Sequence, residues 1–103
     1  MAWINKFDFL EENEVWKCHG IDTKEDSVTF YFKNEDEYPG YRAMIGIPTK
    51  RSGRKYFWYK FFIKGTGGKN FQLEELPQEF HDMVIQASTL VDERKRLARL
   101  LNE

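Results

Sequence analysis

The chain contains little cysteine, proline or glycine, and it has no long apolar run. Of its 103 residues, one is cysteine, three are proline and seven are glycine. Because Cys18 has no second cysteine to pair with, an internal disulfide is excluded and nothing requires an oxidising compartment. No apolar run approaches the roughly 18–20 residues of a membrane span, and the first residues lack the pattern of a signal peptide. We therefore expect a single soluble, cytoplasmic domain without a membrane partner.

Acidic residues are missing from the middle of the chain. Residues 39–73 carry eight bases and no acid, whereas residues 1–38 carry ten acids and four bases, and residues 74–103 carry seven acids and four bases. The net charge of −1 conceals these three unlike stretches. A long stretch with only positive charge predicts an anionic partner. That partner is a nucleic acid, an acidic protein surface, or the chain's own acidic N-terminal segment.

Aromatic residues, in contrast, are abundant. Nine Phe, five Tyr and three Trp make up 17% of the chain. A domain of this size has a small interior. We therefore expect some of the rings to lie at the surface.

The spacing of apolar residues predicts an α+β fold. Alternating apolar and β-branched residues predict strands at 15–21, 27–33, 41–47 and 54–64. Apolar residues then recur at helical spacing and predict a helix over 77–101, beginning near Pro77. The short connections predict a four-stranded antiparallel β-meander, with the C-terminal helix packed on one face. The single domain 1–103 thus consists of an N-terminal segment (1–13, with a short helix or turn at 8–12), the meander (14–64) and the helix (77–101).

Successive side chains of a strand point to opposite faces of the sheet. One face is expected to form the core under the helix, from Val28, Phe30, Phe32, Ala43, Ile45, Ile47, Phe57, Tyr59, Phe61 and Ile63. The other face is expected to gather Thr29, Tyr31, Lys33, Arg42, Met44, Tyr56, Trp58, Lys60, Phe62 and Lys64. Rings stack on nucleobases and cations neutralise phosphates. The second face is therefore a candidate surface for single-stranded nucleic acid, with the basic turn of Lys50, Arg51, Arg54 and Lys55 at one end.

A second interpretation of the same residues stays open. The N-terminal segment would cover the second face and turn it into another core, with lysine side chains reaching outward at its edges. The covering residues would be Trp3, Ile4, Phe7, Phe9 and Leu10. The sequence does not choose between an open and a covered face.

Residues 54–91 also carry a recognisable order of short motifs. The last strand is followed by the turn Gly68-Lys69, the element Phe71-Gln72-Leu73, the helix start Glu79-Phe80 and the apolar pair Met83-Val84. In this order the chain resembles the transcriptional positive-cofactor-four family of single-stranded DNA binding proteins. The resemblance implies a dimer formed through the helix. It also implies that single strands are held across the sheet by Tyr56, Trp58, Lys60, Phe62, Lys64 and Lys69.

No catalytic or metal-binding constellation stands out. The glycine-rich turn from Gly65 to Lys69 lacks the spacing of a phosphate-binding loop, and Asn70 stands where Ser or Thr would hold magnesium. Cys18, His19 and His81 supply too few ligands for zinc. Cys18 is expected to be a small buried apolar group. We expect no metal, no cofactor and no enzymatic activity.

The expected function is a non-enzymatic module that holds single-stranded DNA or RNA on its aromatic and basic sheet face. The expected binding residues are Tyr31, Lys33, Arg42, Lys50, Arg51, Arg54, Lys55, Tyr56, Trp58, Lys60, Phe62, Lys64 and Lys69. The alternative is a small protein-interaction module, such as a phage or mobile-element inhibitor or adaptor, which docks its basic strand on an acidic partner. Positions seven apart on the helix suggest a homodimer seam at Phe80, Ala87, Arg94 and Leu101.

Overall fold

Four antiparallel strands and two α-helices form the fold of residues 6–49, 56–65 and 71–100, the part of the chain that this computed structural model describes. The elements are α1 (Asp8–Glu11), β1 (Lys17–Thr23), β2 (Ser27–Lys33), β3 (Tyr41–Pro48), β4 (Trp58–Ile63), the 3-10 turn η2 (Leu73–Glu75) and α2 (Gln78–Leu100). The strand order in the sheet is β1-β2-β3-β4, and each neighbouring pair is antiparallel. The predicted meander followed by a helix is confirmed.

The strand boundaries differ from the predicted ones at β1, β3 and β4. β3 extends one residue beyond its predicted end, to Pro48, which pairs with Ser27. Proline is tolerated at this terminal position because no ladder hydrogen bond from its nitrogen is needed there. β1 begins at Lys17 because Asn13 organises the preceding turn: its Oδ1 accepts hydrogen bonds from the backbone N–H groups of Val15 (3.0 Å) and Trp16 (2.7 Å). A side chain that bonds nearby backbone in this way competes with the sheet ladder. β4 begins at Trp58. Residues 54 and 55 of the predicted strand lie outside the described part.

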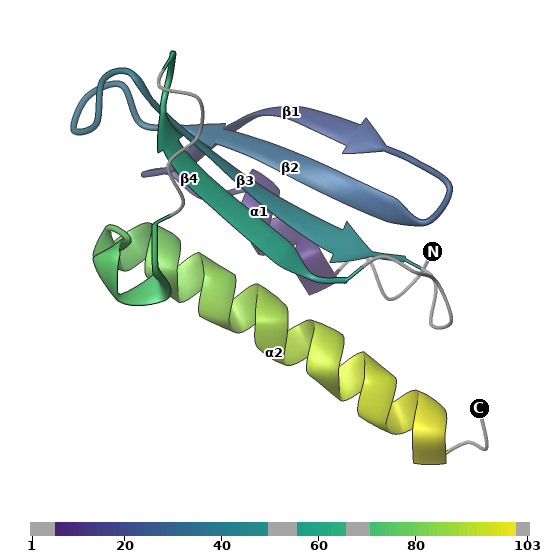
Figure 1. The fold of residues 1–103 in the computed structure, drawn as a ribbon. Coiled ribbons are helices and arrows are strands. Elements are labelled where there is room, and N and C mark those ends of the chain that lie inside the picture. Colours follow the sequence, from purple (N-terminus) through teal and green to yellow (C-terminus); the bar gives the residue numbers. More distant parts are fainter. Residues whose placement is uncertain (1–5, 50–55, 66–70, 101–103) are drawn as a thin grey trace.

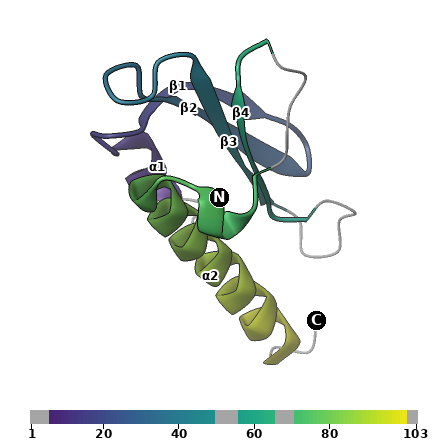
Figure 2. The ribbon, with the colours of Figure 1, turned by 60° about the vertical axis from the view of Figure 1, so that its left-hand side comes forward.

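Both helices lie on the same side of the sheet (Figures 1 and 2). On that side the predicted core is confirmed for β2, β3 and the centre of β4: Val28, Phe30, Phe32, Ala43, Ile45, Ile47 and Phe61 are buried. The helix contributes the buried residues Phe80, Met83, Val84, Ala87 and Val91. Phe57 and Tyr59 are partly buried against this core.

The N-terminal segment adds to the helix-side core. Phe7 and Leu10 are buried there, and Phe9 packs against it. These three residues therefore do not form a second core on the other face of the sheet. Trp3 and Ile4, the remaining residues of that interpretation, lie outside the described residues.

Trp16 occupies the centre of an aromatic cluster that the strand pattern did not assign. Its side chain is fully buried, and its ring centroid lies 5.4 Å from that of Tyr38, 5.6 Å from Phe61 and 5.7 Å from Phe80. The residue precedes β1, so it is free of the strand's alternation and turns inward from the Asn13 turn. Much of the aromatic excess is thus used inside the domain.

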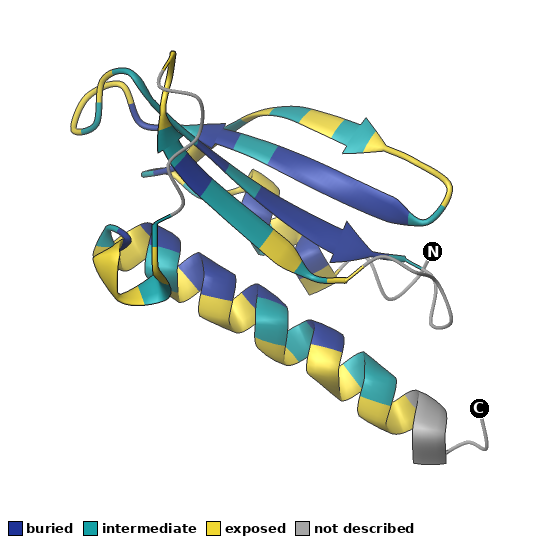
Figure 3. Cartoon of the chain, in the orientation of Figure 1, coloured by how far each residue is buried: buried dark blue, intermediate teal, exposed yellow. Residues whose placement is uncertain are grey.

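Two apolar residues near the ends of their elements are exposed. Ile63, which was expected in the core, is the last residue of β4, at the edge of the sheet, and Leu97 lies in the final turns of α2. The buried stripe of α2 ends at Val91, and beyond that point the described helix surface is exposed or half-buried (Figure 3). The C-terminal part of α2 therefore extends beyond the core that the rest of the helix covers.

The expected dimer seam on α2 is largely used within the chain. Phe80 and Ala87 are fully buried in its own core. Arg94 donates from Nη2 to the backbone carbonyl of Thr49 at 3.0 Å. Leu101 lies outside the described residues, and the homodimer stays a prediction.

Candidate nucleic-acid interface

The candidate interface lies on the face of the sheet opposite α1 and α2, called here the outer face. The register of the strands sorts its side chains into rows that cross the sheet. At one end, Lys17 pairs with Lys33, and Arg42 pairs with Phe62. The pairing of Phe32 with Ala43 places Lys33 beside Arg42. Three cations and one ring therefore follow each other across the four strands, and we call them the cation row.

The second row carries rings, a thioether and another lysine. Tyr31 pairs with Met44, and Met44 pairs with Lys60. The ammonium of Lys60 lies 5.2 Å from the ring centroid of Phe62, two residues along β4. This cation–π contact joins the second row to the cation row.

The third row holds the indole of Trp58. Thr29 pairs with Gly46, and Gly46 pairs with Trp58. The indole lies directly over Gly46, where a Cβ would overlap Nε1 and Cε2 of the ring. Trp58 is 36% exposed, which is unusual for a tryptophan in a small domain. The predicted grouping of Tyr31, Lys33, Arg42, Trp58, Lys60 and Phe62 on one face is therefore seen in the structure.

Lys64 follows the end of β4. Its backbone N–H donates to the carbonyl of Gly40 at 2.8 Å, which continues the pairing of β3 with β4. Strand alternation then puts its exposed side chain on the same face as Phe62. The residue extends the positive charge of the outer face beyond the cation row.

An acidic turn borders the cation row. Glu35 accepts a hydrogen bond from Arg42 Nη1 at 2.7 Å, and the same nitrogen donates to the carbonyl of Tyr41. The turn is held by Asn34, whose Oδ1 accepts from the backbone N–H of Glu37 at 3.0 Å. A cavity of about 300 Å³ lies between this turn and the row, and both Lys17 and Lys33 line it. Part of the row's positive charge is therefore already balanced.

Tyr56 does not join the other rings. Its side chain is exposed and its ring centroid lies 5.9 Å from the ammonium of Lys95 on α2, a helix that packs on the opposite side of the sheet. Alternation fails here because Tyr56 precedes the first residue of β4. The other predicted residues, Lys50, Arg51, Arg54, Lys55 and Lys69, lie outside the described part of the chain.

Two further residues of the outer face were not assigned to it from the sequence. Lys17 completes the cation row, and the ring of His19 lies 6.4 Å from that of Tyr31. A register irregularity between Cys18 and Gly20 shifts the alternation of β1 at His19. Pairing β1 with β2 from their short turn would have found Lys17. The irregularity carries no comparable signal in the sequence.

Cys18 lies on the core side of β1 and is partly buried, with Sγ donating to the carbonyl of Gly20 at 3.4 Å. Within the described residues, no group of three or more His, Cys, Asp or Glu side chains is arranged to hold a metal ion. No helix in that same part of the chain is long and apolar enough to cross a membrane.

A scan of protein-family models and searches of curated proteins and of solved structures found no match for this chain.

Proposed function

We propose that the protein binds single-stranded nucleic acid on the outer face of its sheet. The observation that carries the proposal is the interleaving of three rings with cations on this face, while both described helices pack on the other. The rings are Tyr31, Trp58 and Phe62, and the cations are Lys17, Lys33, Arg42, Lys60 and Lys64. Aromatic faces accept unpaired bases without sequence preference, and the cations track the phosphates.

The spacing of the rings suits an extended strand. Trp58 and Phe62 lie on the same side of β4 and are about 14 Å apart at 3.4 Å per residue. Lys60 lies between them and points the same way. A single strand that stacks a base at each ring would pass its phosphates over this ammonium. A duplex offers no unpaired bases to the rings, so single strands are the expected ligand.

Fluorescence anisotropy with labelled 20-nucleotide oligo(dT) and oligo(rU) tests the proposal. Affinity should fall as salt rises, with a log–log slope of about −0.7 for each phosphate contacted. Trp58→Ala should weaken binding roughly 5- to 150-fold, since base stacking contributes about 1–3 kcal/mol. That loss should exceed the loss caused by removing any one lysine.

The matched control is Ile85→Ala, which also truncates an exposed apolar side chain but on α2. It should leave the affinity unchanged. Tyr56→Ala should have a smaller effect than Trp58→Ala because its ring lies beside Lys95. Absence of binding at low salt, or an affinity indifferent to Trp58, would overturn the proposal. Co-purification of a protein that survives nuclease treatment would then favour the acidic protein partner.

A further inference from the structure

β1 is an outer strand of the sheet, with a paired neighbour on one side only in the described part of the chain. Across the β1–β2 turn, the backbone N–H of Lys24 donates to the carbonyl of Ser27 at 2.8 Å. In an antiparallel pair, hydrogen-bonded and non-hydrogen-bonded positions alternate. The pairs Thr23–Val28 and Ile21–Phe30 are then non-hydrogen-bonded. The N–H and C=O groups of Ile21 and Thr23 consequently point away from β2, toward the outer edge.

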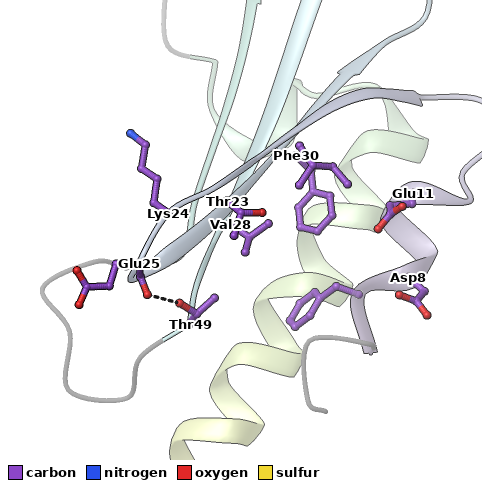
Figure 4. Close-up of a pocket in the computed structure, with 10 residues that line it drawn as sticks. Asp8, Glu11, Thr23, Lys24, Glu25, Val28, Phe30 and Thr49 are labelled. Atoms are coloured by element: carbon purple, nitrogen blue, oxygen red, sulfur yellow. Dashed lines mark hydrogen bonds between the residues drawn. The ribbon is translucent and has the colours of Figure 1, made fainter. Parts of the chain in front are cut away.

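A groove of about 430 Å³ lies beside these two residues, on the helix side of the sheet (Figure 4). Its apolar part is formed by Phe7, Ile21, Val28 and Phe30. Its rim is formed by Asp8, Glu11, Thr23, Lys24, Glu25 and Thr49. Ile21 is 44% exposed, so an apolar side chain on an edge strand is open to solvent. Exposed edges of this kind are templates for another strand.

The outward backbone groups and the groove belong to the same residues. A strand that pairs with the outer edge of β1 would be hydrogen-bonded to Ile21 and Thr23. Directly opposed side chains point to the same face of a sheet. Side chains opposite Ile21 or Thr23 would therefore enter the groove, whose volume is within the range of ligand-binding pockets. Backbone pairing combined with side-chain pockets is the general mode of strand addition.

Charge indicates what kind of strand fits. Figure 4 shows the Glu11 side chain on the side of α1 toward Phe30, and Asp8 lies one turn away on the same helix. No ion pair joins either carboxylate to another described residue. Lys24, the cation on the rim of the groove, pairs with Asp22 and not with them, with Nζ 3.9 Å from Oδ2. A lysine or arginine would complement this rim. A second copy of β1 would bring Ile21 and Thr23 to the groove, and these carry no charge.

We propose that the outer edge of β1 and this groove bind an extended, basic peptide segment of a partner protein as a fifth strand. An apolar side chain of the segment fills the groove between Ile21, Phe30 and Phe7. A lysine or arginine two residues away faces Glu11. This site is on the helix side and uses none of the outer-face residues, so it does not depend on the proposed nucleic-acid binding.

Selection from a degenerate library of seven-residue peptides, displayed on phage, provides the probe. The enriched sequences should contain an apolar residue with lysine or arginine two positions away. The synthetic form of one enriched peptide is then titrated against the wild-type protein and its variants by fluorescence anisotropy. In amide hydrogen exchange, this peptide should slow the outward N–H groups of Ile21 and Thr23.

Thr23→Pro removes one outward N–H and leaves the β1–β2 bonds intact, since proline is tolerated on the free side of an edge strand. It should lower the affinity for the peptide at least tenfold, whereas the affinity of the matched control Thr23→Val should stay within twofold of wild type. Far-UV circular dichroism and urea denaturation of Thr23→Pro report whether the variant is folded. Glu11→Gln should weaken the peptide several-fold. Glu12→Gln, its exposed neighbour outside the groove, should not.

Three results would overturn the proposal. The first is a library that yields no enrichment. The second is an enriched peptide that leaves the exchange of Ile21 and Thr23 unchanged, a readout on the wild-type protein that holds even if Thr23→Pro does not fold. The third is protection of these amides that rises with protein concentration alone, since the occupant would then be a second copy. The test measures peptide binding and amide exchange, so its outcome does not depend on whether the protein binds oligonucleotides.

Discussion

The indole of Trp58 rests on the backbone of Gly46 in the neighbouring strand. A Cβ built on Gly46 would overlap Nε1 and Cε2 of the ring and lie 2.6 Å from Cδ1. Thr29, paired with Gly46 on the other side, is only 7% exposed although it belongs to the outer face. The absence of a side chain at Gly46 therefore lets the largest ring of this face lie flat on the sheet. Aromatic cover of a strand glycine is a recognised device for stabilising sheets.

Gly46→Ala should displace the indole of Trp58. Strand propensity favours alanine over glycine only slightly, whereas overpacking costs about 1–3 kcal/mol. We expect a net loss of stability in urea denaturation and a shift of the Trp58 fluorescence emission. Oligonucleotide affinity should fall with the displaced ring.

Gly20→Ala is the matched control on the same face. There a Cβ would meet Tyr31 Cδ2 at 3.8 Å, which is ordinary van der Waals contact. In a Trp58→Ala background, the cost of Gly46→Ala should largely disappear. An equal cost in both backgrounds would show that the glycine matters for a reason other than the ring.

Glu35→Gln should strengthen nucleic-acid binding. The carboxylate holds Arg42 Nη1 at 2.7 Å and competes with phosphate for it. Because exposed ion pairs contribute about 0–1 kcal/mol, affinity should rise by up to roughly fivefold, with little change in the free energy of unfolding. Anisotropy titration with the labelled oligonucleotide at low salt measures the change in affinity. Glu79→Gln, exposed at the start of α2, is the control and should have no effect. Weaker binding by Glu35→Gln would mean that Glu35 positions Arg42 rather than competing for it.

Trp16→Ala should be among the most damaging single substitutions. The ring is fully buried and meets Tyr38, Phe61 and Phe80. Truncating a buried aromatic residue of this size costs about 3–5 kcal/mol. Urea denaturation should show this loss, and a clearly smaller loss for Trp58→Ala, whose ring is partly in solvent. Equal losses would place the two rings in equivalent surroundings, contrary to the structure.

Regular alternation was a good guide where one face of a strand is buried. β2 was predicted with its observed bounds because its apolar residues alternate without interruption from Ser27 to Lys33. β1 begins two residues later than predicted because the Asn13 side chain accepts hydrogen bonds from the backbone of Val15 and Trp16. The apolar pattern of the sequence does not report this interaction between side chain and main chain. The helix was recovered because its apolar stripe has a regular period.

The candidate site was recovered only where the strand regularity persists. Trp58, Lys60 and Phe62 share a face because they lie inside β4. Tyr56 departs from them since it precedes the strand and meets Lys95 instead. Lys17 enters the cation row through its register with Lys33, a relation between strands.

The sequence by itself determined the order of the elements, the core face of the sheet and the charge of its middle stretch. Strand and helix periodicities are local, and so they can be read from neighbouring residues. The tertiary structure decided which face the segment before β1 covers, because both faces carry apolar side chains. Phe7 and Leu10 join the core cluster that contains Phe30. The tertiary structure also decided the packing of the Trp58 ring on Gly46 and the ion pair between Arg42 and Glu35. These relations depend on distances between separate strands and turns, which only the folded chain sets.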